Sequence, residues 1–207
     1  MRAQFGVVVP IRTFALANTR LSEALSDDAR ATLALRLADI VVRAAGDAPV
    51  VIVTSAPEVE QWARGHALDL APDPGSLDAA AAAGIEALAA RGVRRAVVAH
   101  ADLPFAATFH SVTRDAGRPV AVLVPDQRDD GTPVLSVPTH AGFAFAYGPE
   151  SFRRHLDAAR SVGLAVRVVR DPELAFDVDT VDDLREVSAR APELLPPELL
   201  PIAEARS

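Results

Sequence analysis

The stretch SDDARATLALRLADIVVRAAGDAPVVIVTS (residues 26–55) joins a helical pattern directly to a strand pattern. Ser26 suits the position that caps a helix, and Gly46 suits the residue at which a helix ends. The two aspartates after Ser26 place negative charge in the first helical turn, where the helix dipole favours it. The last seven residues are almost continuously apolar, which is typical of a strand buried on both faces. The stretch therefore predicts one helix and strand unit of an α/β sheet.

The same alternation continues on both sides of this unit. Strand patterns occupy residues 5–11, 95–102 and 120–126, and helical patterns occupy residues 56–67 and 76–92. Strands that alternate with helices in this way form a right-handed and mainly parallel sheet. We therefore predict a Rossmann-like α/β fold whose mainly parallel sheet is flanked by helices.

The pattern changes after residue 126. Residues 126–138 combine an irregular turn with a short strand pattern, and residues 142–152 alternate like a further short strand. A helical pattern returns over residues 149–163. These segments predict a β-hairpin insertion that precedes the next helix.

The length and composition of the chain indicate a single core. The 207 residues, half of them hydrophobic, predict one domain over residues 1–189. Residues 190–207 form a proline- and leucine-rich tail that packs as an arm on the body, packs on a second copy in a homodimer, or stays partly mobile. The chain has no cysteine, and its first apolar run ends at Pro10, too early for a signal sequence or a membrane span. We expect a cytoplasmic protein without a membrane partner.

The charge balance limits the kinds of ligand. A net charge of −7 argues against a nucleic-acid partner, because binding to many phosphates needs a basic surface. A small anion can still bind at a local basic pocket. All 21 basic side chains are arginine, so any cationic contact to such an anion must come from a guanidinium.

Two aspartates in FDVDTVDDL (residues 176–184) stand two positions apart after an apolar run. On an extended segment, Asp177 and Asp179 leave the same face while the valine between them points to the other. Two converging carboxylates suit Mg²⁺, which completes its shell with water and substrate phosphates. Thr180 and Asp183 also match a capping box, so the cluster could simply start a helix. Both interpretations hold if Thr180 caps the helix while the two aspartates face a cleft.

Further candidates lie at the carboxyl ends of predicted strands, where open α/β sheets bind ligands. Asp102 in HADLP (residues 100–104) fits a second metal-binding carboxylate as well as a turn residue. Arg12 and Arg20 follow the first strand and could bracket a polyphosphate, with a surface position for Arg20 as the alternative. The chain contains no Walker A or GxGxxG motif, which excludes a P-loop and a dinucleotide fingerprint.

Two segments suit a small anion. DDGTPVL (residues 129–135) places Thr132 beside a glycine, which fits a phosphate or carboxylate site and equally a hairpin turn. YGPES (residues 147–151) offers Gly148 and Ser151 at the start of a helix, which fits an anion site and equally an ordinary helix start. The five histidines show no metal-ligand spacing, and we assign them no role.

The ordered motifs VPIR…ANTRLS, ADLP, DDGTPVL, YGPESFRRH and FDVDTVDDL resemble the 2-phospho-L-lactate guanylyltransferase family, which includes the phosphoenolpyruvate guanylyltransferases of coenzyme F420 biosynthesis. The likeness runs from about residue 7 to about residue 184. It implies a nucleotidyltransferase domain over residues 1–189 that uses Mg²⁺ and GTP. The family usually has lysine where this chain has Arg12 and Asn18, and asparagine where it has Asp78.

The resemblance also implies roles for individual residues. It implies metal binding by Asp102, Asp177 and Asp179; a catalytic set of Arg12, Arg20 and Asp102; acceptor binding by Thr132, Gly148 and Ser151; and nucleotide binding by Arg12, Arg20, Leu77 and Asp78. The acceptor of this family is a small phosphorylated acid, so the two anion-binding segments would hold its phosphate and carboxylate.

We therefore predict a Mg²⁺-dependent guanylyltransferase that transfers GMP from GTP to phosphoenolpyruvate or 2-phospho-L-lactate and releases pyrophosphate. The alternatives are a diverged member that uses another phospho-acid, such as 3-phosphoglycerate, and a non-catalytic relative that binds a nucleotide or phospho-acid. A sugar-phosphate nucleotidyltransferase shares the fold but is expected to have a glycine-rich first loop. The first loop of this chain, FALANT (residues 14–19), contains no glycine. The unstable product of the predicted reaction also suggests a hand-over to the next enzyme of the pathway.

Overall fold

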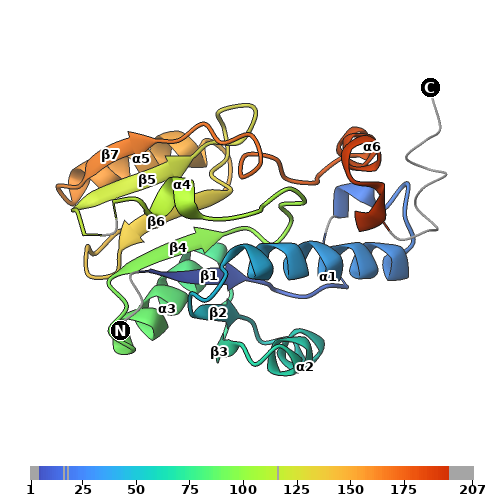
Figure 1. Ribbon diagram of the computed structural model, residues 1–207, viewed down its shortest axis with the longest axis horizontal. Coiled ribbons are helices and arrows are strands. Elements are labelled where there is room, and N and C mark those ends of the chain that lie inside the picture. Colours follow the sequence, from blue (N-terminus) through green and yellow to red (C-terminus); the bar gives the residue numbers. More distant parts are fainter. Residues whose placement is uncertain (1–4, 16, 18, 116, 196–207) are drawn as a thin grey trace.

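The computed structural model describes residues 5–15, 17, 19–115 and 117–195. These residues build one seven-stranded sheet in the order β3-β2-β1-β4-β6-β5-β7 (Figure 1). The strands are β1 (Gly6–Pro10), β2 (Val50–Val53), β3 (Asp69–Ala71), β4 (Arg95–Ala99), β5 (Val120–Val124), β6 (Val134–Pro138) and β7 (Ala165–Val168). The predicted strands at residues 5–11, 95–102 and 120–126 and the strand that ends the opening stretch are therefore all present.

The sheet is mainly parallel, as predicted. The pairs β1 with β2, β1 with β4, β2 with β3, and β5 with β7 are parallel. Only β6 runs against its neighbours β4 and β5. The hairpin that forms joins β5 to β6 instead of the two segments predicted for it, and its second strand lies inside the sheet between β4 and β5.

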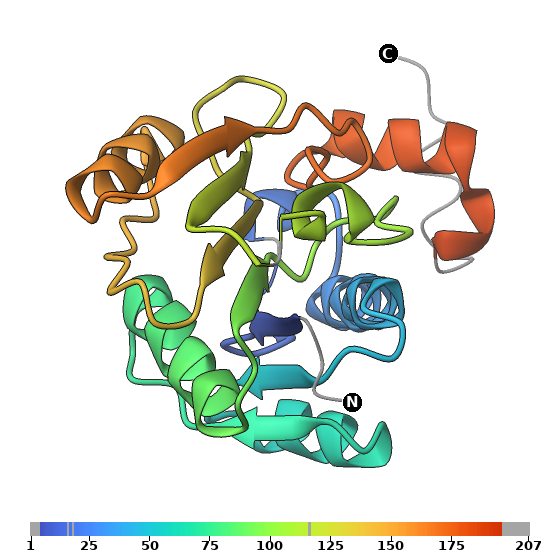
Figure 2. The same cartoon turned by 60° about the vertical axis from the view of Figure 1, so that its left-hand side comes forward.

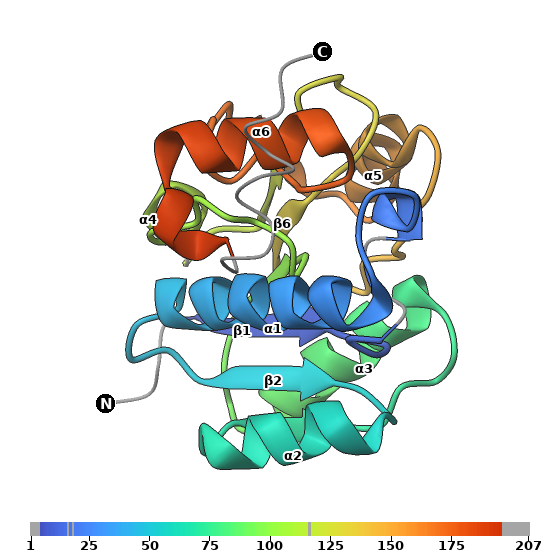
Figure 3. The same ribbon diagram turned by 90° about the vertical axis from the view of Figure 1, so that its right-hand side faces the viewer.

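Helices cover both faces of the sheet (Figures 2 and 3). The helices are α1 (Asp27–Ala44), α2 (Pro57–Gly65), α3 (Leu77–Ala90), α4 (His110–Thr113), α5 (Ser151–Ser161) and α6 (Val181–Arg190), with short 3-10 turns η1 (Thr19–Leu21) and η2 (Pro192–Leu194). Apolar residues of α1, α2, α4 and α6 share one core, and those of α3 and α5 share the other. Val7 and Val9 of β1 face the first core while Val8 faces the second, which explains why the strands read as continuous apolar runs.

A glycine lets α3 lie very close to the central strand. A Cβ atom added to Gly84 would come within 2.2 Å of a methyl group of Val8 on β1 and 3.0 Å of Val53 on β2. No larger residue fits at this position without movement of the helix or the sheet. The close packing fixes the N-terminus of α3, which begins at Leu77 after the capping residue Ser76.

The strand predicted within residues 142–152 is wrong. Residues 143–147 form no strand and no ladder with a neighbouring strand. Two of their amides instead donate to side chains, from Ala146 to His155 Nε2 at 2.9 Å and from Tyr147 to Asp78 Oδ1 at 2.6 Å. The alternation that suggested a strand comes from aromatic side chains of this segment that pack against the second core.

The edge strands β3 and β7 are short and partly exposed, so neither shows the continuous apolar run by which the buried strands were predicted. The predicted tail is described only as far as residue 195, where Leu195 is buried in the first core; residues 196–207 lie outside the described part. Within the described ranges, no helix is both long and apolar enough to cross a bilayer.

Candidate active site

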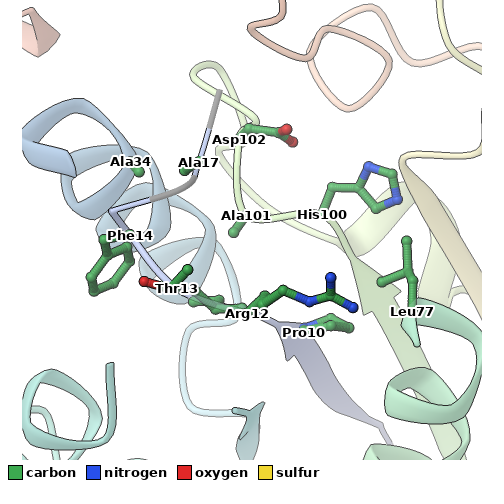
Figure 4. A pocket seen from close by; sticks show the side chains of 11 residues that line it. Pro10, Arg12, Thr13, Phe14, Ala17, Ala34, Leu77, His100, Ala101 and Asp102 are labelled. Atoms are coloured by element: carbon green, nitrogen blue, oxygen red, sulfur yellow. The ribbon is translucent and has the colours of Figure 1, made fainter. Parts of the chain in front are cut away.

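A pocket of about 250 Å³ opens where β1 and β4 end (Figure 4). The two strands are parallel neighbours, so their carboxyl ends bring distant parts of the sequence together at one edge of the sheet. The pocket is lined by residues 10–14, 17, 34, 77 and 100–102. Arg12 and Asp102, both predicted from their positions at strand ends, therefore share one pocket.

Arg12 and Leu77 also belong to a second hollow of about 250 Å³ on the side of β2. Its other walls include Val53, Asp73 and Ser76. The guanidinium of Arg12 donates to the carbonyl oxygen of Gly75 at 2.7 Å, which ties the end of β1 to the loop before α3. Arg12 and Leu77, two of the four predicted nucleotide-binding residues, thus stand in the shared wall of two adjoining hollows.

Three aspartates lie near enough to one another, beside this pocket, to influence each other's charge. Asp102 follows β4, and its carbonyl oxygen accepts a hydrogen bond from the amide of Val178 at 3.1 Å. Phe176 and Val178 are buried, which leaves Asp177 and Asp179 on the opposite side of the extended segment. The predicted alternation of this segment is confirmed, and the backbone bond holds it against the end of β4.

The electrostatics of the cluster favour a cation. The pKa of Asp177 is raised to about 7, first by burial and then by the negative charges of Asp102 and Asp179. Burial also raises the pKa of Asp102, and its Oδ1 atom has no hydrogen-bond partner among the described residues. Over the same residues, no three acidic or histidine side chains form a complete metal-binding group. The donors are carboxylate oxygens, which suit Mg²⁺ when substrate oxygens supply the remaining ligands.

Arg20 reaches the acidic cluster from η1. Its Nη1 atom lies 2.5 Å from Asp179 Oδ2, although both side chains remain partly exposed. Leu21, the next residue, is fully buried and anchors η1 to the core. The first loop therefore places a second guanidinium beside the acidic cluster, where its contact with a nucleotide stays a prediction, while the departure at Asn18 lies outside the described residues.

The capping interpretation of the acidic segment is also confirmed. The side chain of Thr180 accepts from the amide of Asp183, and Asp183 Oδ2 accepts from the amide of Thr180, which completes a capping box at the start of α6. Asp183 also accepts from the amide of Asp179 at 3.0 Å. The cap holds the backbone of the acidic segment, so the same residues start a helix and orient the cluster.

The turn before Thr132 is built around one carboxylate. Asp126 accepts hydrogen bonds from the amides of Arg128, Asp130 and Gly131 at 3.0, 2.9 and 2.8 Å. A Cβ atom on Gly131 would lie 2.7 Å from Asp126 Oδ2, so a larger residue would displace this carboxylate. Three backbone amides thus hold the turn on one carboxylate, and Thr132 lies in the interior rather than at an exposed hairpin tip.

Thr132 and Ser151 lie together, but their side chains are buried. Their hydroxyl oxygens are 3.4 Å apart, and Thr132 Oγ1 is 3.1 Å from His155 Nδ1. His155 Nε2 accepts from the amide of Ala146, so the proton of the neutral ring sits on Nδ1 and is donated to Thr132. Burial lowers the pKa of His155 to about 4, which keeps the ring neutral.

Gly148 completes the predicted acceptor group. Its φ of +101° lies in a region that favours glycine, and its carbonyl oxygen accepts from the amide of Ser151 at 3.0 Å. The residue is exposed at the start of α5, close to the buried hydroxyl pair. The structure thus places Thr132, Gly148 and Ser151 close together, while their binding of the acceptor stays a prediction, and it adds His155, whose place no spacing rule indicates.

A family model described as "Guanylyl transferase CofC like" matches residues 5–192. The chain belongs to this family. It is 35% identical over 192 residues to a phosphoenolpyruvate guanylyltransferase of Sphaerobacter thermophilus, covering 89% of this chain and 93% of the relative. It is 30% identical over 198 residues to a phosphoenolpyruvate guanylyltransferase of Chloroflexus aggregans, covering 89% of this chain and 96% of the relative.

The fold of this guanylyltransferase family member is also similar to solved nucleotidyltransferase structures. A nucleotide-diphospho-sugar transferase of Desulfovibrio desulfuricans matches with a TM-score of 0.71 at 17% identity, over 91% of this chain and 87% of that one. A nucleotidyl transferase of Methanothermobacter matches with a TM-score of 0.62 at 16% identity, over 90% and 96% of the two chains. These matches confirm the predicted Rossmann-like nucleotidyltransferase fold.

One predicted residue of the guanylyltransferase lies apart from the others. Leu77 lines both hollows, but Asp78 is absent from the lining of either one. The carboxylate of Asp78 accepts from the amide of Tyr147 and so links α3 to the segment before α5. Asp78 therefore holds the backbone of the site, and its predicted contact with the nucleotide stays a prediction.

Proposed function

We propose that this guanylyltransferase transfers GMP from GTP to a small phosphorylated carboxylic acid, phosphoenolpyruvate or 2-phospho-L-lactate, in coenzyme F420 biosynthesis. The observation that carries the proposal is the mutual charge repulsion of Asp102, Asp177 and Asp179 beside the pocket that Arg12 lines. The printed names of the relatives support phosphoenolpyruvate as the acceptor. Thr132, Gly148 and Ser151 stay the residues proposed to bind the acceptor, with Gly148 exposed beside the buried hydroxyls of the other two.

The proposed reaction exchanges one phosphoanhydride bond for another. A phosphate oxygen of the acceptor attacks the α-phosphorus of GTP, a new P–O bond forms, and the bond from the α-phosphorus to the β-phosphate oxygen breaks. Pyrophosphate leaves with the electron pair. The attacking oxygen is already ionised at neutral pH, so no side chain needs to act as a base, and catalysis depends on positioning and charge neutralisation.

Arg12 and Arg20 are the cationic side chains proposed to neutralise the phosphates. Arg12 lines the pocket, and Arg20 is placed at the acidic cluster by its ion pair with Asp179. Both carry permanently charged planar groups that can bind two phosphate oxygens at once. Arg12 stands where this family usually has a lysine, so the positive charge at that position is kept.

Asp102, Asp177 and Asp179 are the residues proposed to hold Mg²⁺. The raised pKa of Asp177 and the unpartnered oxygen of Asp102 support this assignment, because a bound cation would relieve both the charge repulsion and the lost hydration. When bound, Mg²⁺ would neutralise negative charge on the phosphates and align them.

Pyrophosphate release tests the proposed function. Purified protein would be offered Mg²⁺ and GTP with phosphoenolpyruvate, 2-phospho-L-lactate or 3-phosphoglycerate in turn, and with ATP, CTP or UTP in place of GTP. We expect release with GTP and one of the first two acids. Asp177→Asn should abolish it, whereas Asp182→Asn, on an exposed side chain of α6, should not. Pyrophosphate release with 3-phosphoglycerate alone would support a diverged family member that uses another phospho-acid. If the folded protein binds GTP but releases no pyrophosphate with any acid, a non-catalytic relative is supported.

The setting of the reaction is part of the proposal. We place it in the cytoplasm, because the proposed substrates are highly charged metabolites that do not cross membranes unaided. The homodimer and the hand-over of the product to the next enzyme stay predictions, which size-exclusion chromatography and coupled assays can check.

A further inference from the structure

A third hollow, the basic hollow, lies at the opposite end of the strands from the active site. It measures about 460 Å³ and is lined by residues 94, 117–119, 138, 140, 141 and 164. Arg94 directly precedes β4, whereas the pocket of the active site includes the residues that directly follow this strand. The five residues of β4 span roughly 16 Å, so the two hollows are separate.

The polar side chains that line the basic hollow are all cationic or can become so. They are Arg94, Arg118 and His140, and the described lining contains no acidic residue. Within the described ranges, Arg94 and His140 form no ion pair, and Arg118 Nη1 lies at a long 3.8 Å from Asp115 Oδ1. Asp115 is bound more closely by Arg167, at 2.7 Å. In a chain of net charge −7, the basic hollow thus gathers positive charge that its surroundings leave largely unneutralised.

A buried guanidinium holds one wall of the basic hollow in place. Arg95 is fully buried, and its Nη2 atom donates to the carbonyl oxygens of Arg118 and Val120 at 2.9 and 3.0 Å. Its Nη1 atom donates to the hydroxyl of Ser136 at 3.1 Å, while its Nε atom has no partner in the described part of the chain. A permanently charged group therefore fixes the segment that carries Arg118 and adds positive charge close to it.

Backbone hydrogen bonds hold further parts of the lining. The carbonyl oxygen of Arg94 accepts from the amide of Thr139 at 3.0 Å, and the carbonyl oxygen of Pro119 accepts from the amide of Ala165 at 3.1 Å. The side chains of Arg94 and His140 form no hydrogen bond with any residue that the structure describes. The backbone is thus engaged while these polar groups are left for a ligand, so the hollow is preorganised for binding.

We propose that the basic hollow binds a small phosphorylated molecule with an apolar body. Each of the two lining guanidinium groups can bind two phosphate oxygens, and the ring of His140 can add a further donor. Pro119, Pro138 and Leu164 supply apolar surface beside these groups. A volume of about 460 Å³ is typical of small-molecule sites and leaves room for more than a phosphate group. The binding does not depend on guanylyl transfer, because no residue of this hollow belongs to the active site.

Phenyl phosphate is a suitable probe, because it joins a phosphate to an apolar ring. It would be titrated into the full chain while amide signals are followed by ¹⁵N NMR. The amides of Gly117 and Ala141 should shift until they saturate, and phenyl phosphate should bind more tightly than inorganic phosphate. Arg94→Gln and Arg118→Gln should each weaken this binding about tenfold, because each loses a charge-assisted contact. The matched control Arg64→Gln, on an exposed side chain of α2, should leave the affinity unchanged.

The amide shifts separate binding in the basic hollow from binding in the active site. Both arginines are exposed, so the variants should keep the melting temperature of the wild type. Shifts at Gly117 and Ala141 that do not saturate, or an affinity that is unchanged in both arginine variants, would overturn the site. Equal affinities for phenyl phosphate and inorganic phosphate would overturn the apolar body. Tighter binding of a hexaglutamate peptide would overturn the small-molecule ligand in favour of an acidic protein partner.

Discussion

Replacing Asp177 by asparagine should stabilise the metal-free protein while abolishing its activity. The substitution keeps the size of the side chain and removes one charge from a cluster of three carboxylates. In the fold the pKa of Asp177 rises from 3.8 to about 7. A pKa shift of one unit corresponds to ~1.4 kcal/mol, so the ionised form of Asp177 destabilises the folded state by up to ~4 kcal/mol. The side chain is partly exposed, so solvent screening reduces the expected gain to ~2 kcal/mol.

The gain should depend on pH in a defined direction. Because the folded state binds this proton more tightly than the unfolded chain, the wild type loses stability as the pH rises from about 4 to about 7. The asparagine variant lacks this loss. The difference in melting temperature between the two proteins should therefore widen from pH 5.5 to pH 7 and level off above it. For a chain of this size, ~2 kcal/mol corresponds to a difference of about 4–8 °C at pH 8.

The assay is thermal unfolding followed by circular dichroism across this pH range, first with a chelator and then with Mg²⁺. Mg²⁺ should raise the melting temperature of the wild type and leave that of Asp177→Asn nearly unchanged, because binding to the folded state alone adds stability. Equal melting temperatures at pH 8 without metal, or a difference that narrows as the pH rises, would refute the charge repulsion inferred for the cluster.

Two further predictions concern the first loop and the packing of α3. Arg20→Gln should raise the KM for GTP about tenfold, because one charge-assisted contact is lost. It should change the free energy of unfolding by less than ~1 kcal/mol, because the ion pair of Arg20 with Asp179 is exposed. Steady-state kinetics and urea unfolding measure the two effects, and an unchanged KM would show that Arg20 does not bind the nucleotide. Gly84→Ala should lower the free energy of unfolding by ~1–3 kcal/mol, because the new Cβ atom would collide with Val8. If the variant is as stable in urea as the wild type, α3 can move away from the sheet.

The regular part of the fold could be predicted because each element has its own local pattern. Ser26 and the aspartates after it mark the start of α1, and the apolar run that follows Gly46 marks β2. The metal-site hypothesis also depends only on neighbouring residues, because two residues that stand two positions apart on an extended segment share a face. The structure adds the buried neighbours of Asp177 and the bond that holds the segment against Asp102.

The acceptor side of the site could be predicted only in part. Motifs identified Thr132 and Ser151. The place of His155 beside them is visible only in the structure, where its ring nitrogens bond Thr132 and the amide of Ala146. The same side-chain bonds explain the wrong strand, because a periodic pattern gives no information on whether an amide pairs with a strand or with a side chain. Likewise, the buried and unpaired hydroxyl of Tyr147 among the described residues depends on how the folded chain packs, so it could not be predicted from the sequence.

The measurement that tests the central claim most directly is phosphorus NMR of the reaction mixture just after Mg²⁺ and GTP are mixed with phosphoenolpyruvate and the protein. Guanylyl transfer predicts two coupled phosphorus signals of a new diphosphate, together with an equal amount of inorganic pyrophosphate. Neither should form with Asp177→Asn, and both should form with Asp182→Asn. If folded wild-type protein binds GTP but produces no new coupled signals with phosphoenolpyruvate or 2-phospho-L-lactate, the proposed guanylyl transfer to these acids is contradicted.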